Sequence, residues 1–250
     1  MNNSLLKLPV LALLVFFLSF TNDNLKKAQM KYAHVKTAYD DKWTGLEKLL
    51  KDKKINSADF ELYLRAFKYD KKLEVWARSI STDLKYTHIK TFDICATSGE
   101  LGPKRKEGDG QIPEGFYEID LLNPTSSYYL SMRVNYPNYS DRLLGDKKNP
   151  GGAIMVHGNC VTIGCMPITD ECIKELYVLA VETKNKGHKI PIDIFPCYFN
   201  DKNYEMLKKN YSADLVAFWD ELRDGYNHFE KKKYTALVTT DSKGKYSVKD

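Results

Sequence analysis

Apolar residues recur at steps of three and four near both ends of the chain, which is the spacing that lines one face of a helix. The first run predicts one long amphipathic helix, which either packs on the main domain or forms a stalk. The second predicts a helical region interrupted near Ser212. The two stripes are Leu25, Ala28, Tyr32, Val35, Tyr39, Trp43, Leu46 and Leu50, and then Tyr204, Leu207, Tyr211, Leu215, Phe218, Leu222, Tyr226 and Phe229.

Between these stripes apolar and polar positions alternate, which is the period of a strand. Residues 61–67 and 72–78 alternate on either side of a short polar link, so they predict a hairpin. Further strands are expected over residues 86–97, 115–120, 128–134, 152–157 and 190–199, with links rich in glycine and proline at 99–115 and 136–152. Short strands with such links indicate a β domain of sandwich or barrel type.

A helix is expected after Thr169, whose hydroxyl is suited to cap it. Asp170 and Glu171 follow in the first turn, where the helix dipole favours negative charge, and Gly187 is expected to end the helix. Its buried stripe is Ile173, Leu176, Tyr177, Ala180 and Val181. The predicted fold class is therefore α+β, with a mostly β domain flanked by N- and C-terminal helices.

The first residues have the pattern of an export signal. Lys7 precedes an apolar run over residues 8–20, which is too short to span a bilayer comfortably. We expect a signal peptide over 1–21, with an uncleaved anchor as the alternative, and a location in the periplasm or cell envelope. The remaining segments are expected to be an N-terminal helical segment (22–57), the main domain (58–200), a C-terminal helical segment (201–233) and a polar tail with little to bury (234–250).

The charge is mixed in sign, with 38 basic and 33 acidic residues and a net charge of +5. A nucleic-acid binder concentrates its positive charge, and no such block stands in this sequence. We therefore expect no nucleic-acid partner, and membrane contact only through an uncleaved signal.

The candidate chemistry lies where an apolar run delivers His157, eight residues before Cys165. A cysteine attacks as the thiolate, and a neighbouring histidine can take its proton. Gly164 permits a sharp turn that leaves backbone N–H groups free for a substrate oxygen. Thr162 offers a hydroxyl to orient the histidine or a substrate carbonyl. These are the parts needed for acyl transfer through a thioester, and the alternative is that Cys165 is structural.

The chain has five cysteines, an odd number, so an exported form has at least one unpaired thiol. If Cys165 is free, the other four cysteines can form two bridges in three possible connectivities. A fully reduced state also stays open for these four, which are Cys95, Cys160, Cys172 and Cys197. Paired C-x-x-C knuckles are missing, so we expect no zinc site, no other metal and no cofactor.

The stretch His157-Gly158-Asn159-Cys160-Val161-Thr162-Ile163-Gly164-Cys165 resembles the signature of the L,D-transpeptidase (YkuD-like) catalytic domain, and within it the YafK-like branch. The start of the following helix, Ile168-Thr169-Asp170-Glu171, resembles that branch too. So do three upstream segments, which lie at 98–117, 122–127 and 135–142. The likeness covers about residues 60–199.

The resemblance implies chemistry on peptidoglycan stem peptides at meso-diaminopimelate. Cys165 would be the nucleophile, His157 the general base and acid, Gly164 with the Cys165 N–H the oxyanion site, and Thr162 the orienting hydroxyl. It also implies substrate-binding roles, which we assign to Gly158, Asn159, Arg142 and Tyr136. A wall-linked protein is a further expected partner.

Two positions depart from the broad family. Ile163 stands where many members have a histidine, and Pro167 stands where many have an arginine, whose anchoring role Arg142 is a candidate to fill. The branch shares both departures, and some of its members resemble hydrolases. Three outcomes therefore stay open: cross-linking, amidase-type release of a diaminopimelate-linked peptide or protein, and non-catalytic wall binding.

Overall fold

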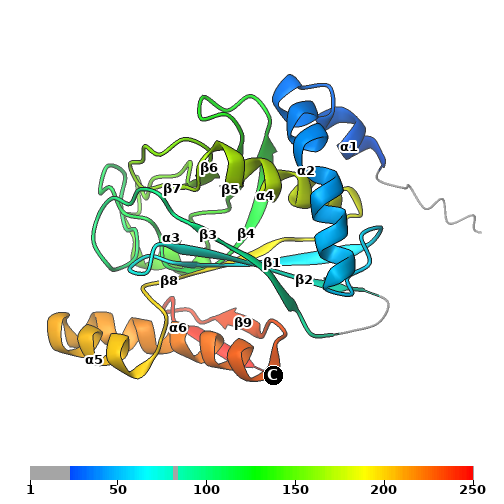
Figure 1. Ribbon diagram of the computed structural model, residues 1–250. Helices are drawn as coiled ribbons and strands as arrows, with labels where there is room; N and C mark the ends of the chain where they lie inside the picture. The colour runs from blue at the N-terminus through cyan, green and yellow to red at the C-terminus, as the bar shows by residue number, and fades with distance from the viewer. Residues whose placement is uncertain (1–22, 81–83, 250) are drawn as a thin grey trace, which may run out of the picture.

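The computed structural model describes residues 23–80 and 84–249, so the signal expected over 1–21 lies outside the described part. One mixed sheet organises it, with strand order β3-β2-β1-β8-β4-β5-β6-β7. Its strands are β1 (Phe60–Phe67), β2 (Lys72–Ser79), β3 (Thr87–Asp93), β4 (Gly115–Asn123), β5 (Ser131–Val134), β6 (Met155–His157), β7 (Met166–Pro167) and β8 (Pro191–Phe195). The strands β5, β6 and β7 turn away from the plane of the others (Figure 1), so the sheet curls.

The predicted hairpin is confirmed, because β1 and β2 pair antiparallel from Phe60 opposite Ser79 to Phe67 opposite Lys72. The alternation expected for the first of these strands is wrong: nearly every residue of β1 is buried, Arg65 included. Helices cover both faces of this part of the sheet, which explains the difference. Arg65 pairs with Glu230 at 2.7 Å and lies against several aromatic rings.

One face of the sheet carries α4 (Asp170–Asn185) and the N-terminal helices α1 (Asp23–Gln29) and α2 (Ala33–Asp52) (Figure 1). The hydroxyl of Thr169 accepts a bond from the Cys172 N–H, so the expected cap is confirmed. The single long N-terminal helix is a wrong prediction, since the chain breaks between α1 and α2. Both pieces pack on α4, where Tyr39 donates to Glu182 at 2.9 Å, and the segment is not a stalk.

The opposite face is covered by α5 (Asp201–Asn210) and α6 (Ala213–Lys232), with the predicted break at Ser212, which caps α6. The C-terminal tail stays mostly exposed but is folded, which the sequence pattern did not predict. The strands β9 (Leu237–Thr240) and β10 (Tyr246–Lys249) form a hairpin, and the Tyr246 ring is buried against α6. The hairpin also touches α3 (Tyr139–Leu144), where the Ser140 hydroxyl donates to the Gly244 carbonyl. No helix within the described ranges has the length and apolar character to cross a membrane.

The carboxylate of Glu114 lies fully buried at the start of β4. It pairs with the Lys68 ammonium at 3.0 Å and accepts from the Trp219 indole N–H at 2.6 Å and from the Gly102 N–H at 2.8 Å. Burial lowers the pKa of Lys68, and the charge of Glu114 opposes that effect. This cluster connects α6 to the loop that precedes β4.

We expect Glu114→Gln to lower the free energy of unfolding by about 3 kcal/mol, because it leaves the buried Lys68 charge without its partner. Urea denaturation followed by circular dichroism measures this loss. The matched control is Glu118→Gln on β4, where the carboxylate is partly exposed and its partner Lys189 is exposed. That control is expected to lose less than about 1 kcal/mol. Similar losses in the two variants would contradict the assigned role of Glu114.

Candidate functional site

His157 and Cys165 come from neighbouring strands. His157 ends β6, and Cys165 directly precedes β7, which pairs with β6 in parallel through Val156 opposite Met166 and His157 opposite Pro167. Side chains two residues apart along a strand share a face, so the register directs His157 and Cys165 toward the same side of the ladder. The short loop over residues 158–164 joins the two positions.

The imidazole of His157 is only 1% exposed. Its Nδ1 lies 2.5 Å from the Gly158 carbonyl oxygen. A carbonyl can only accept, so Nδ1 donates a proton there and Nε2 keeps a free lone pair. Burial lowers the pKa of His157 below its ordinary value of 6.5, against the smaller effect of the Gly158 carbonyl. The imidazole is therefore neutral at neutral pH and able to accept a proton.

The thiol of Cys165 is partly exposed and lies 3.5 Å from the Ala153 carbonyl oxygen. Burial raises the pKa of this thiol above its ordinary value of 9.0, while the Met155 N–H and the charge of Lys104 oppose that effect. At neutral pH the resting site therefore holds a neutral thiol and a neutral imidazole. The thiolate forms when a base removes the proton.

Two hydroxyls hold the backbone at the cysteine. The Cys165 N–H donates to the Thr162 hydroxyl at 2.8 Å, and the same hydroxyl donates to the Cys165 carbonyl at 2.8 Å. The Gly164 N–H donates to the Ser98 hydroxyl at 2.7 Å. In this structure Thr162 therefore bonds the cysteine backbone, and both N–H groups expected to face an oxyanion are occupied by hydroxyl oxygens.

The start of the loop is fixed to α4. The Asn159 N–H donates to Asp170 at 2.8 Å, and the Asn159 side chain accepts from the Cys160 N–H. A Cβ at Gly158 would lie 2.5 Å from the Asp170 carboxylate and 2.8 Å from the Tyr128 carbonyl, so this position requires glycine. In the structure Gly158 and Asn159 shape the loop, and their expected substrate contacts remain a prediction.

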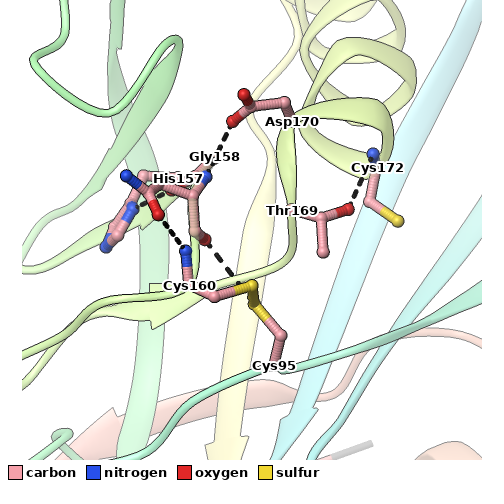
Figure 2. The surroundings of a disulfide bond; sticks show 8 residues. Cys95, His157, Gly158, Cys160, Thr169, Asp170 and Cys172 are labelled. Carbon is pink, nitrogen blue, oxygen red and sulfur yellow. Dashed lines mark hydrogen bonds between the residues drawn. A yellow bond between two sulfur atoms is a disulfide. The ribbon is translucent and has the colours of Figure 1, made fainter.

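A disulfide between Cys95 and Cys160 joins the segment after β3 to the same loop (Figure 2). Both residues are exposed, while Cys165, Cys172 and Cys197 are free. The bonding is thus neither of the two arrangements left open by the sequence, since a single bridge forms. Together with the bond from Gly164 to Ser98, the bridge fixes residues 95–98 alongside the cysteine loop.

A cavity of about 490 Å³, here called the Arg142 cavity, adjoins the thiol through Ala153. Tyr136 and Arg142, two of the four residues expected to bind substrate, both line it, and their role in binding stays a prediction. The Tyr136 hydroxyl donates to the Pro150 carbonyl at 2.9 Å. Arg133 also lines the cavity but is held by Asp120 at 2.8 Å. Within residues 23–80 and 84–249, Arg142 has no ion pair, so its exposed guanidinium is available to a carboxylate.

Two further residues act on the cysteine loop and were not predicted from the sequence: Ser98 bonds its backbone, and the charge of Lys104 acts on the thiol. Both stand in the upstream segment that carries the family likeness, so the motif marks them, but nothing local indicates their contacts. Lys104 is buried and pairs with Asp109 at 2.6 Å, and its charge acts on the thiol. Among the described residues no group of three or more His, Cys, Asp and Glu side chains is arranged to hold a metal.

The solved structures that match this chain are distant from it. The helical cell shape determining protein Pgp2 from Campylobacter jejuni is 17% identical, with a TM-score of 0.45, covering 78% of this chain and 80% of that one. Bd1075 of Bdellovibrio bacteriovorus is 21% identical, with a TM-score of 0.39, covering 70% of this chain and 61% of that one.

Sequence comparison gives a closer relationship. YafK, a protein of Escherichia coli K12 that is named as an L,D-transpeptidase, is 31% identical over 190 residues, which are 75% of this chain and 73% of YafK. The model of the L,D-transpeptidase catalytic domain, YkuD, matches residues 70–194, and this range contains both His157 and Cys165. The chain therefore belongs to the YkuD family of L,D-transpeptidase catalytic domains.

Proposed function

We propose that the protein is a cysteine-dependent acyltransferase acting on peptidoglycan stem peptides at meso-diaminopimelate. The observation that carries this proposal is the β6–β7 register, which directs His157 and Cys165 to one side of the ladder. Beside them lies a cavity whose Arg142 has no ion pair among the described residues. Family membership supplies the substrate class. The Arg142 cavity suits the acyl side of the substrate, whose stem peptide carries free carboxylates.

The reaction begins when Nε2 of His157 takes the proton of the Cys165 thiol. The thiolate attacks the carbonyl carbon on the L-centre of meso-diaminopimelate, and the carbonyl oxygen gains negative charge. That oxyanion is a stronger acceptor than a neutral hydroxyl, so the Gly164 and Cys165 N–H groups exchange their hydroxyl partners for it. The C–N bond then breaks, His157 returns its proton to the leaving amine, and a thioester remains.

The thioester reacts onward with an amine or with water. An amine gives a new cross-link or an attached protein, and water gives hydrolysis, as in amidase-type release from the wall. Peptidoglycan lies outside the cytoplasmic membrane, so the proposal sets the protein in the cell envelope. The exposed Cys95–Cys160 disulfide supports that location, since such bonds persist in oxidising compartments.

Cys165 is the proposed nucleophile, so its removal should abolish the reaction. Incubation with purified sacculi or tetrapeptide muropeptides, followed by mass spectrometry, should give new cross-links, and Cys165→Ala should abolish them. Cys172→Ala is the matched control, because Cys172 is another free, partly exposed thiol and lies in α4. Loss of a terminal residue without cross-links would instead indicate hydrolysis. Binding without any thioester mass would indicate a wall-binding module.

The protonation states of His157 and Cys165 predict how the reaction depends on pH. Burial lowers the pKa of His157, so the base is protonated only below about pH 6.5, and kcat/KM should fall as the pH drops through that region. Burial raises the pKa of Cys165, so alkylation of the free enzyme by iodoacetamide should rise steeply only above about pH 9. An alkylation midpoint below pH 7 would contradict the neutral resting pair and indicate a thiolate–imidazolium pair.

Thr162 is expected to act as a positioning residue for the nucleophile. Thr162→Val removes both hydroxyl bonds to the Cys165 backbone and should lower the acylation rate about 10- to 100-fold, because the thiol loses its fixed orientation. Thr162→Ser keeps the hydroxyl and should restore most of the rate. Stopped-flow acylation by a chromogenic β-lactam measures both variants. Equal rates in the two variants would show that the hydroxyl has no such role.

A further inference from the structure

A second cavity, of about 340 Å³, adjoins the cysteine loop at Ser98, and none of its lining residues lines the Arg142 cavity. Ser98 lines it and accepts the N–H of Gly164, the residue before the nucleophile, at 2.7 Å. The cavity is here called the Lys71 cavity. The residues that matter for its chemistry are Lys68, Tyr69, Lys71, Glu100 and Tyr211.

The two lysines of this cavity differ in what they can bind. The Lys68 ammonium is buried and already bonded to the Gly102 carbonyl, the Ile112 carbonyl and Glu114, so all three of its protons are used. Lys71 is exposed, and no ion pair engages its ammonium within the described ranges. The cation available to a ligand is therefore Lys71.

Glu100 supplies the opposite charge. Its backbone N–H donates to Gln111, while its exposed carboxylate makes no hydrogen bond or ion pair in the described part of the chain and acts on Lys68 only through its charge. The exposed ring of Tyr69 and the half-buried ring of Tyr211 line the same space. The cavity thus offers one free cation, one free anion and aromatic surface, which suits a ligand with an ammonium, a carboxylate and an aliphatic chain.

We propose that the Lys71 cavity binds the amine side of the scissile bond, as an amino acid residue with a free carboxylate. This inference rests on the proposed function and deepens it. Lys71 pairs with the carboxylate while the thioester forms on Cys165. When the C–N bond breaks, the nitrogen takes the proton held by His157 and then gains one from water. Glu100 pairs with the resulting ammonium.

Two amine components share this chemistry and differ in length. A terminal D-amino acid carries its carboxylate one carbon from the departing nitrogen. A C-terminal lysine attached through its side chain carries its carboxylate at the far end of a methylene chain. Both expose a free carboxylate to Lys71. Paired substrates distinguish these two sources.

The experiment uses two substrate pairs and the full chain. One pair is the tetrapeptide ending in D-alanine and its D-alaninamide; the other is the tripeptide joined to the side chain of N-acetyl-lysine and its lysinamide. Mass spectrometry follows release of the amine. In at least one pair the free acid should react about five-fold faster than the amide, the effect of one exposed ion pair. The pair that discriminates identifies the amine component.

The decisive variant is Lys71→Glu, which should remove or reverse this preference. Lys72→Glu is the matched control, since Lys72 is adjacent and pairs with Asp93 instead of lining the cavity. The control should keep the preference. Equal rates for acid and amide in both pairs of the unaltered protein, or an unchanged preference in Lys71→Glu, would overturn the inference.

A binding measurement separates this inference from the proposed function. Titration of Cys165→Ala with free D-alanine and N-acetyl-lysine, monitored by amide chemical shifts, should perturb residues 98–100 with the acid more than with its amide. Lys71→Glu and Glu100→Gln should each weaken that response. If no substrate acylates Cys165 but the response is present, the proposed function fails and the binding site stands. If acylation occurs and the response is absent, the binding site fails.

Discussion

The buried carboxylate of Glu114 connects parts of the chain that are far apart in sequence. It receives bonds from Lys68 directly after β1, from Gly102 in the loop between β3 and β4, and from Trp219 in α6. A buried charge is tolerated only when its partners are complete, so these contacts must all form together. The loop they fix carries Ser98, and Ser98 in turn holds the backbone beside Cys165. Helix α6 thus supports the site through this loop.

The site is built from neutral groups. Burial lowers the pKa of His157 and raises the pKa of Cys165, and both shifts favour the uncharged form. A resting ion pair is therefore avoided, and the thiol stays unreactive toward general electrophiles. Reactivity is expected to require a substrate that brings its carbonyl to the thiol. The N–H groups of Gly164 and Cys165, which would then stabilise the oxyanion, are held in position by the hydroxyls of Ser98 and Thr162.

Local patterns predicted the local features. The β1–β2 hairpin, the Thr169 cap and the break at Ser212 follow from periodicity and from residue preferences within a few positions. The short separation of His157 and Cys165 also agrees with their positions at the ends of the paired strands β6 and β7. The β9–β10 hairpin gave no such signal, because its strands are short and mostly exposed. The bridge and the bond from Gly164 to Ser98 join residues more than sixty positions apart, where only tertiary folding brings them together.

The Cys95–Cys160 bond also closes residues 95–160 into a covalent ring. That ring contains β4, β5, α3, β6 and the exposed loops between them, such as residues 146–149. A protease that cuts one peptide bond inside the ring releases no fragment, because both new ends remain joined through sulfur. The strand that carries His157 stays attached to the chain after such a cut. Once a reductant breaks the disulfide, the same single cut separates the chain into two pieces that no covalent bond joins.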